Sequence, residues 1–213
     1  MRLLWAALLV LAAIPAVANA AEEASKTSGA ITGYYYAMRD QPDFGVGVAA
    51  LNRGSLHLEA RYNYEARHST SVFAGWKFAG GDTVSYEVTP ILGALFGDAR
   101  GVVPGLEGSV AWRNVDAYIE AEYVRDLNVH DDSFFYMWSE LGWRPVEWLR
   151  LGLVGQRTRV IHNDRDLQRG LFAQATIGPA TISLYGFNPE SASLVQFEKQ
   201  RFTAPKGNDS SNL

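Results

Sequence analysis

The sequence predicts an all-β fold: a single antiparallel transmembrane β-barrel of about twelve strands, with about ten as the alternative. Three observations lead to this prediction. Short segments of alternating apolar and polar residues follow one another along the chain. Short and long connections between these segments alternate along the chain, and several tryptophans lie beside the short ones.

The first twenty residues have the composition of a secretory signal peptide. Arg2 supplies a positive start, residues 3–17 are almost wholly apolar, and Ala18-Asn19-Ala20 is a small-residue cleavage motif. The apolar run is short for a retained membrane anchor. We therefore expect a signal peptide over 1–20, a flexible leader over 21–28, a barrel over 29–202 and a disordered tail over 203–213.

The charge and cysteine content narrow the class of protein. Arg2 is the only charged residue among residues 1–20. Without this segment the chain has 18 Lys and Arg against 23 Asp and Glu, a net charge of −5. No basic stripe is present, so a nucleic-acid partner is not expected. The chain has no cysteine. An exported protein without disulfides needs another source of stability, which a closed ladder of strands would supply.

The alternating segments are the expected strands. They lie at roughly 29–38, 44–52, 55–65, 69–78, 82–97, 102–113, 115–125, 133–144, 148–160, 167–177, 180–187 and 191–202. In the segment 55–65 the apolar face carries Leu56, Leu58, Ala60, Tyr62 and Tyr64, and the polar face carries His57, Glu59, Arg61, Asn63 and Glu65. A soluble sandwich with its apolar face inward gives the same alternation, so periodicity alone leaves both folds open.

The lengths of the connections favour the barrel. Every second connection is short, as at Asn52-Arg53-Gly54, Asn114 and Gly178-Pro179. Several of the others are longer and more polar, as at 39–43, 126–132 and 161–166. Outer-membrane barrels have short periplasmic turns and longer external loops, whereas a sandwich has no reason to sort its loops in this way.

The aromatic residues gather at the expected strand ends. The candidate membrane-interface residues are Trp76, Trp112, Trp143 and Trp148 beside the short turns, and Tyr62, Tyr64 and Tyr123 near the opposite ends. Amphipathic rings favour the headgroup region of a bilayer, so this placement predicts one aromatic belt at each rim.

These alternating strands, together with the closing segment 180–189 and a last strand ending at Phe202, resemble small bacterial outer-membrane β-barrel proteins as a general class. The resemblance implies a location in the outer membrane of a Gram-negative cell, with outer-membrane lipids and the barrel-assembly machinery as partners. Members of the class typically end in an aromatic residue. Here eleven residues follow Phe202, which departs from that pattern.

The polar faces of the strands would line the barrel interior. The candidate lumen-lining residues are His57, Glu59, Arg61, Lys77, Glu87, Glu107, Arg113, Glu120, Glu122, Glu140 and Arg150. A salt-bridged, partly filled interior is expected, with a narrow aqueous channel as the alternative. The turn near Asn114 should bring Glu107 opposite Glu120 and Glu122. These carboxylates would attract a cation or share a proton, unless Arg61, Arg113 or Arg150 neutralises them.

The function expected from this fold is that of a narrow pore or a structural barrel for small polar solutes, without catalytic residues or cofactors. The alternative is an enzyme acting on envelope lipids, because His68 adjoins Ser69 and Ser71, and His130 lies near Ser133. Two loops combine histidine with acids, His130-Asp131-Asp132 and His162-Asn163-Asp164. Nothing in the sequence fixes their geometry, so no metal site is expected there.

Overall fold

The computed structural model describes residues 6–8, 27–37, 42–128, 132–160 and 165–187, and these form strands joined by turns. The strands are β1 (Ala6–Leu8), β2 (Thr27–Tyr36), β3 (Phe44–Arg53), β4 (Leu56–Tyr62), β5 (Ser69–Trp76), β6 (Phe78–Gly80), β7 (Ser85–Gly97), β8 (Gly101–Trp112), β9 (Val115–Asp126), β10 (Phe134–Val146), β11 (Leu149–Val160), β12 (Arg165–Ile177) and β13 (Ala180–Phe187). No helix in this described part of the chain is long and apolar enough to cross a membrane.

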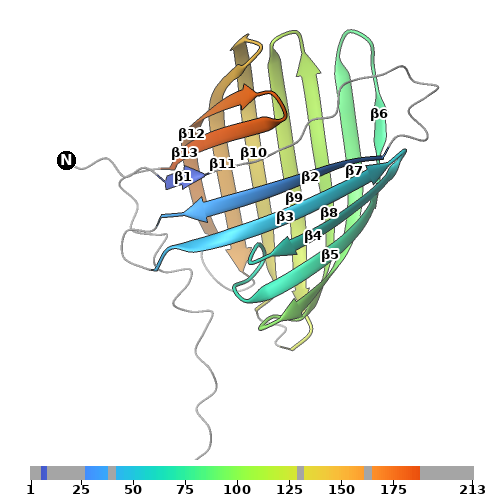
Figure 1. The fold of residues 1–213 in the computed structure, drawn as a ribbon. Helices are drawn as coiled ribbons and strands as arrows, with labels where there is room; N and C mark the ends of the chain where they lie inside the picture. The colour runs from blue at the N-terminus through green and yellow to red at the C-terminus, as the bar shows by residue number, and fades with distance from the viewer. Residues whose placement is uncertain (1–5, 9–26, 38–41, 129–131, 161–164, 188–213) are drawn as a thin grey trace, which may run out of the picture.

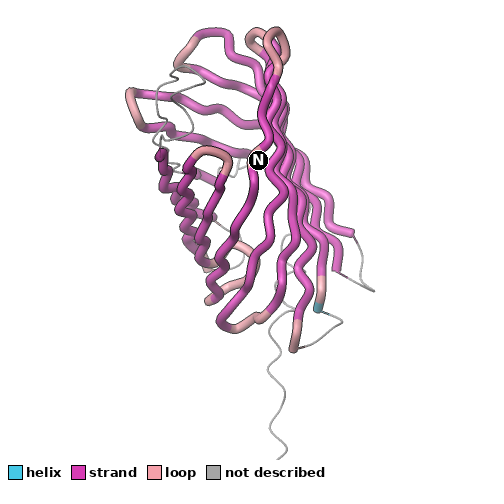
Figure 2. Tube along the Cα trace, turned by 90° about the vertical axis from the view of Figure 1, so that its right-hand side faces the viewer, coloured by secondary structure: helices cyan, strands magenta, loops and turns pink. Residues whose placement is uncertain are grey.

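All the strands belong to one antiparallel sheet, which confirms the all-β prediction. Its order is β1-β13-β12-β11-β10-β9-β8-β7-β5-β4-β3-β2 within the described residues. From β2 to β13 each strand therefore pairs with its neighbour in the chain. β5 and β6 both pair with β7 and are separated only by Lys77, so they act as one interrupted strand. The sheet curls round on itself (Figures 1 and 2).

From β2 to β13, every observed strand except the short β6 coincides with an expected strand to within a few residues. β13 has the predicted bounds, 180–187. The last predicted strand, 191–202, lies outside the described residues. Beside β13 the sheet instead holds β1, which lies within the expected signal peptide and places Ala7 opposite Leu184. β1 also contacts β2 (Figure 1), but no ladder joins these two strands in the described part of the chain.

Tight turns join the strands at one end of the sheet. The strand pairing leaves two residues in the turn after β3, the turn after β8 and the turn after β12. Gly54, Arg113 and Gly178 adopt left-handed backbone conformations there, with φ of 57°, 55° and 57°. Positive φ matches the right-handed twist of the flanking strands, which explains why such short turns close these hairpins. We call this end of the sheet the short-turn end.

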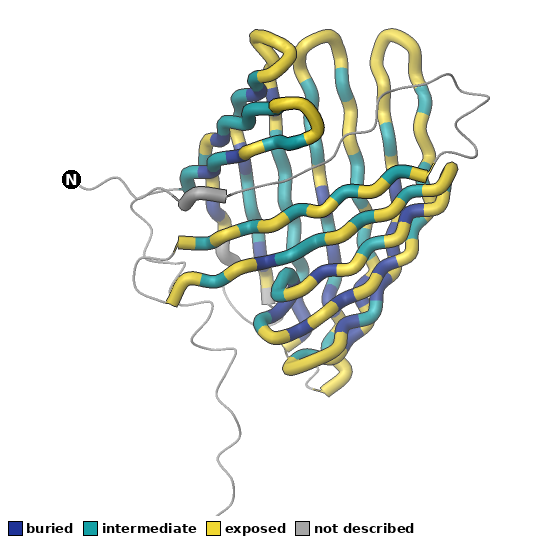
Figure 3. The backbone as a smooth tube through the Cα atoms, viewed as in Figure 1, coloured by how far each residue is buried: buried dark blue, intermediate teal, exposed yellow. Residues whose placement is uncertain are grey.

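Burial changes from residue to residue along many of the strands (Figure 3), as expected when successive side chains point to opposite faces of the sheet. Large apolar residues lie on the outward face: Leu141, Leu153 and Leu171 pair across β10, β11 and β12 and are 51%, 55% and 65% exposed. The inward face of the neighbouring strands carries charge, since Arg61 and Glu122 are only 2% and 1% exposed. This distribution is the reverse of that in a soluble β-sandwich, whose apolar faces meet inside.

Candidate functional site

An ion-pair cluster centred on Arg61 occupies the interior. Arg61 lies on β4, and its Nη1 is 2.6 Å from Glu122 Oε1 and 3.2 Å from Glu120 Oε1, both on β9. The same nitrogen is 3.3 Å from Glu65, and Nη2 is 3.6 Å from Glu107 on β8. A further ion pair joins Arg61 Nε to Glu59 on its own strand. We call these six residues the Arg61 cluster.

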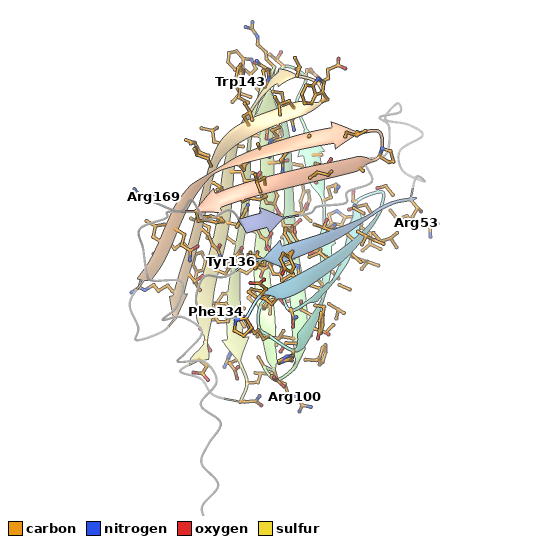
Figure 4. All side chains as sticks on the ribbon, turned by 60° about the vertical axis from the view of Figure 1, so that its left-hand side comes forward. Arg53, Arg100, Phe134, Tyr136, Trp143 and Arg169 are labelled. Atoms are coloured by element: carbon orange, nitrogen blue, oxygen red, sulfur yellow. The ribbon has the colours of Figure 1, made fainter. Side chains whose placement is uncertain are left out.

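Aromatic rings hold the Arg61 guanidinium in place. Its Cζ lies 4.3 Å from the ring centroid of Phe73 and 4.5 Å from that of Tyr64. The Tyr64 hydroxyl donates to Glu120 Oε1 at 2.9 Å. Tyr64 also packs edge-on against Tyr136, which Figure 4 labels in the interior. Cation–π contacts of this kind are strongest where water is excluded, so they support a fixed guanidinium position.

The Arg61 cluster carries an excess of acid. Even with Glu65 left aside, four carboxylates of the described residues surround one guanidinium. Among the described residues, the other group near the cluster that can carry a positive charge is the His57 ring, whose Nε2 is 3.2 Å from Glu59 Oε2. The second oxygen of Glu122, Oε2, is buried and accepts no hydrogen bond from the residues that the structure describes. Enclosed charges of one sign are costly, so the cluster has a net requirement for positive charge.

A second cluster, around Arg150 on β11, is balanced. Arg150 Nη2 is 2.5 Å from Asp116 Oδ1, and its Nη1 is 2.6 Å from Glu140 Oε2. Arg144 forms another ion pair with Asp116. Two guanidinium groups thus face two carboxylates. The Tyr185 hydroxyl donates to Glu140 Oε1 at 2.7 Å, which ties β13 to this network.

A cluster of apolar side chains lies in the interior toward the other end of the sheet. Residues of β5, β7, β8, β9 and β10 pack together there, namely Phe73, Ile91, Leu95, Val103, Val124 and Phe134. Val124 pairs with Phe134 next to the long β9–β10 connection, and Leu95 pairs with Gly101 next to the β7–β8 connection. Figure 4 shows Phe134 and Arg100 far from Trp143, which lies near the short-turn end. We call this group the apolar layer.

Most of the predicted lumen residues face inward. His57, Glu59, Arg61, Glu107, Glu120 and Glu122 meet in or beside the Arg61 cluster, and Glu140 meets Arg150 in the second cluster. Lys77 and Glu87 form a separate ion pair of 3.1 Å, with the Glu87 side chain 41% exposed. The expected approach of Glu107 to Glu120 is present as a direct cross-strand pair. Of the three arginines considered for neutralising it, Arg61 makes the contact.

Two of the predicted positions are wrong. Arg113 does not line the interior, because it lies in the turn after β8 and its guanidinium packs over the ring of Trp112. Tyr64 does not lie at the membrane interface but inside, against Arg61 and Glu120. The reason is local: β4 ends at Tyr62, and Asn63 has φ of 59°, so the alternation that the sequence suggests does not continue to Tyr64.

The other predicted interface residues face outward. Trp76, Trp112, Trp143 and Trp148 are 54%, 47%, 49% and 58% exposed, and Tyr62 is 51% exposed. Tyr123 is half-buried on β9. The four indoles lie on or next to the short turns, as Figure 4 shows for Trp143. They therefore form part of a ring of exposed aromatic residues at that end.

Sequence reasoning missed several interior residues. Asn52 Oδ1 accepts from the His57 ring at 2.9 Å, Ser71 donates to Glu65 at 2.7 Å, and Gln174 bridges Arg150 and Tyr185. The alternation along each strand is enough to predict that these side chains face inward. Their partners could not be predicted, because contacts across the barrel depend on how strongly the sheet curls.

The serine and histidine pairs considered for catalysis are not brought together in the described residues. His68 contacts Asp98 at 3.3 Å, whereas Ser69 donates to the Arg67 carbonyl and Ser71 to Glu65. Ser133 accepts from the Asp126 amide. The loop segments that contain His130 and 162–164 lie outside the described residues.

No protein-family model, curated protein or solved structure matches this chain.

Proposed function

We propose that this chain is an integral outer-membrane β-barrel, exported by a signal peptide over residues 1–20, with an interior closed to through-flow. Its acidic interior accepts small cationic solutes from the short-turn end. The observation that carries the proposal is the reversed distribution of residues, with leucines outside and paired charges inside. A lipid environment is the setting in which this distribution is stabilising.

The outward leucine row illustrates the energetic argument. Removing a leucine side chain from water is worth about 1.5–3 kcal/mol, and the row of Leu141, Leu153 and Leu171 is only one part of the exposed apolar surface. Soluble monomers rarely expose an apolar band of this extent. Acyl chains would cover it, and the exposed tryptophans at the short-turn end would lie among the headgroups.

The closed interior distinguishes a structural barrel from an open pore. The apolar layer lies in the lumen near the long connections, and the Arg61 cluster adjoins it through the contact of Arg61 with Phe73. The apolar layer is buried, and so are Arg61, Glu120 and Glu122 of the cluster. Side chains near the short-turn end are more open: Glu107 is 17% exposed and Lys77 is 24% exposed. This gradient supports access from one end only.

A pair of arginine substitutions tests the membrane location. Leu153→Arg places a charge on the outward face in the middle of β11, which in a bilayer should cost about 2–4 kcal/mol of folding free energy. Leu127→Arg is the control, because Leu127 is 63% exposed but lies in a connection, where the cost should be about 1 kcal/mol or less. Urea unfolding in lipid vesicles measures both. Equal, small effects would contradict the proposal, since surface substitutions in a soluble protein cost about 0.5 kcal/mol or less.

Planar-bilayer recording tests the closed interior. The folded wild-type barrel should insert without stepwise conductance. Steady conductance with a preference for cations would overturn the closed barrel and favour the narrow-pore alternative, while leaving the membrane location intact.

A further inference from the structure

We propose that His57, Glu59 and Glu107 form a binding site for one divalent cation of the zinc type inside the barrel. The inference rests on the proposed function in one respect, that the interior is reached from the short-turn end. The ligand atoms of His57, Glu59 and Glu107, one per residue, all lie within 4.8 Å of one another. His57 and Glu59 are on β4 and Glu107 is on β8, so the site joins strands that are not neighbours in the sheet.

The distances suit a zinc-type ion after a small closure. His57 Nε2 is 3.2 Å from Glu59 Oε2 and 3.9 Å from Glu107 Oε2. Ligands bound tetrahedrally at about 2.0–2.1 Å lie about 3.3 Å apart. The Glu59 oxygen is already at that separation from the imidazole, and only the Glu107 carboxylate needs to move inward. One imidazole and two carboxylates leave the fourth position for water.

The tautomer of His57 points its free nitrogen at the two carboxylates. His57 Nδ1 is 2.9 Å from Asn52 Oδ1. A carbonyl oxygen can only accept, so Nδ1 carries the proton in this contact. Nε2 is thereby left to face the oxygens of Glu59 and Glu107, and with a proton on it Nε2 donates to Glu59 at 3.2 Å. When the ring is neutral, the Nε2 lone pair and the two carboxylate oxygens converge as three ligand atoms, and a metal ion between them would take the place of that proton.

Neighbouring groups orient all three ligands. Asn52 fixes the His57 ring, as an outer partner commonly does for a metal-binding histidine. Arg61 contacts the Oε1 atom of both glutamates. Its Nε pairs with Glu59 Oε1, and its Nη2 is 3.6 Å from Glu107 Oε1. In each carboxylate Oε2 is therefore the oxygen turned toward His57. Neither Glu107 oxygen has a hydrogen-bond donor within 3.5 Å in the described part of the chain, although the side chain is only 17% exposed.

The charge of the Arg61 cluster favours a divalent ion at this position. Glu59, Glu107, Glu120 and Glu122 share one guanidinium, whereas the Arg150 cluster pairs two guanidinium groups with two carboxylates. A bound divalent cation would bring the Arg61 cluster closer to the same balance. The site lies close to the turn after β3, since Asn52 pairs with His57 directly across that hairpin. Glu107 is the most exposed of the three ligands, with its side chain 17% exposed against 8% for His57 and 8% for Glu59.

Calorimetric titration of the untagged, folded barrel in detergent with Zn²⁺ alone tests this proposal. We expect one saturable site per chain in the wild type, and loss of that site in His57→Gln and in Glu107→Gln. Asn52→Ala should weaken binding by about 10–100-fold, the usual effect of removing an outer partner of a metal ligand. The matched control is His68→Gln, which removes an exposed histidine that also faces a carboxylate, Asp98, and should leave binding unchanged.

Two further measurements keep the result decisive. Heat-modifiable mobility in electrophoresis shows whether each variant has folded, and only folded variants are titrated. Zn²⁺ should also raise the thermal midpoint of the wild type and of His68→Gln but not of His57→Gln. Absence of saturable binding in the wild type, retention of binding in His57→Gln, or loss of binding in His68→Gln would each overturn the site. None of these results bears on the vesicle or conductance tests of the barrel itself.

Discussion

Replacing Arg61 by methionine should strongly destabilise the barrel. Methionine has similar length and no charge, so the substitution removes the guanidinium while keeping most of the volume. Four carboxylates, Glu59, Glu107, Glu120 and Glu122, would lose their shared cation. Arg53→Met is the matched control, because Arg53 is exposed beside the turn after β3.

The magnitude follows from the geometry of the cluster. With an effective dielectric constant of about 20, the Arg61–Glu120 pair at 3.2 Å has a Coulomb energy of about 5 kcal/mol. The loss of hydration on burying both groups offsets much of that gain. Removing one partner of a buried ion pair costs about 3–5 kcal/mol in practice, and we expect Arg61→Met to fall in this range. Arg53→Met should change the free energy of unfolding by about 0.5 kcal/mol or less.

A double-mutant cycle with Glu122→Gln isolates the electrostatic part. In the wild-type background Glu122→Gln breaks the 2.6 Å ion pair and should destabilise the barrel. In the Arg61→Met background it removes a buried charge that has no cation, and should stabilise the barrel. Urea unfolding in vesicles, followed by tryptophan fluorescence, gives all four free energies. An equal effect of Glu122→Gln in both backgrounds, or wild-type stability of Arg61→Met, would refute the reasoning.

Two other predictions concern close packing and the open sheet edge. A Cβ at Gly142 would lie 2.8 Å from Arg150 Cζ, so Gly142→Ala should lower the free energy of unfolding by about 1–3 kcal/mol. Gly47→Ala is the control, because a Cβ at Gly47 would have nothing within 4 Å, and it should lower that free energy by less. The same urea unfolding measures both variants. Once the predicted signal peptide is removed, β13 and β2 each need a partner, because unpaired strand edges are not tolerated in lipid. Deleting residues 191–213 from the mature chain should therefore abolish the heat-modifiable folded form, and deleting 203–213 should not. A folded 191–213 deletion would exclude the predicted last strand as the closing element.

The strands were predictable because their signal is local. Alternation with a period of two depends only on the chain itself, which is why the sequence predicts β13 at 180–187 and the other strands, apart from β1 and β6, to within a few residues. The same alternation predicts that Arg61, Glu120 and Glu122 face inward. The pattern failed at Tyr64, where the left-handed conformation of Asn63 reverses the facing of the next residue.

By itself, then, the sequence determined a chain of antiparallel strands with one apolar and one acidic face, and it placed the tryptophans beside the short turns. Only the tertiary structure decided that the acidic face lies inside and which of its groups meet. Glu107 and His57 are 50 positions apart in the chain and on strands that do not pair, yet the atoms Nε2 and Oε2 lie 3.9 Å apart. That contact depends on the curl of the whole sheet, which no local pattern of residues encodes.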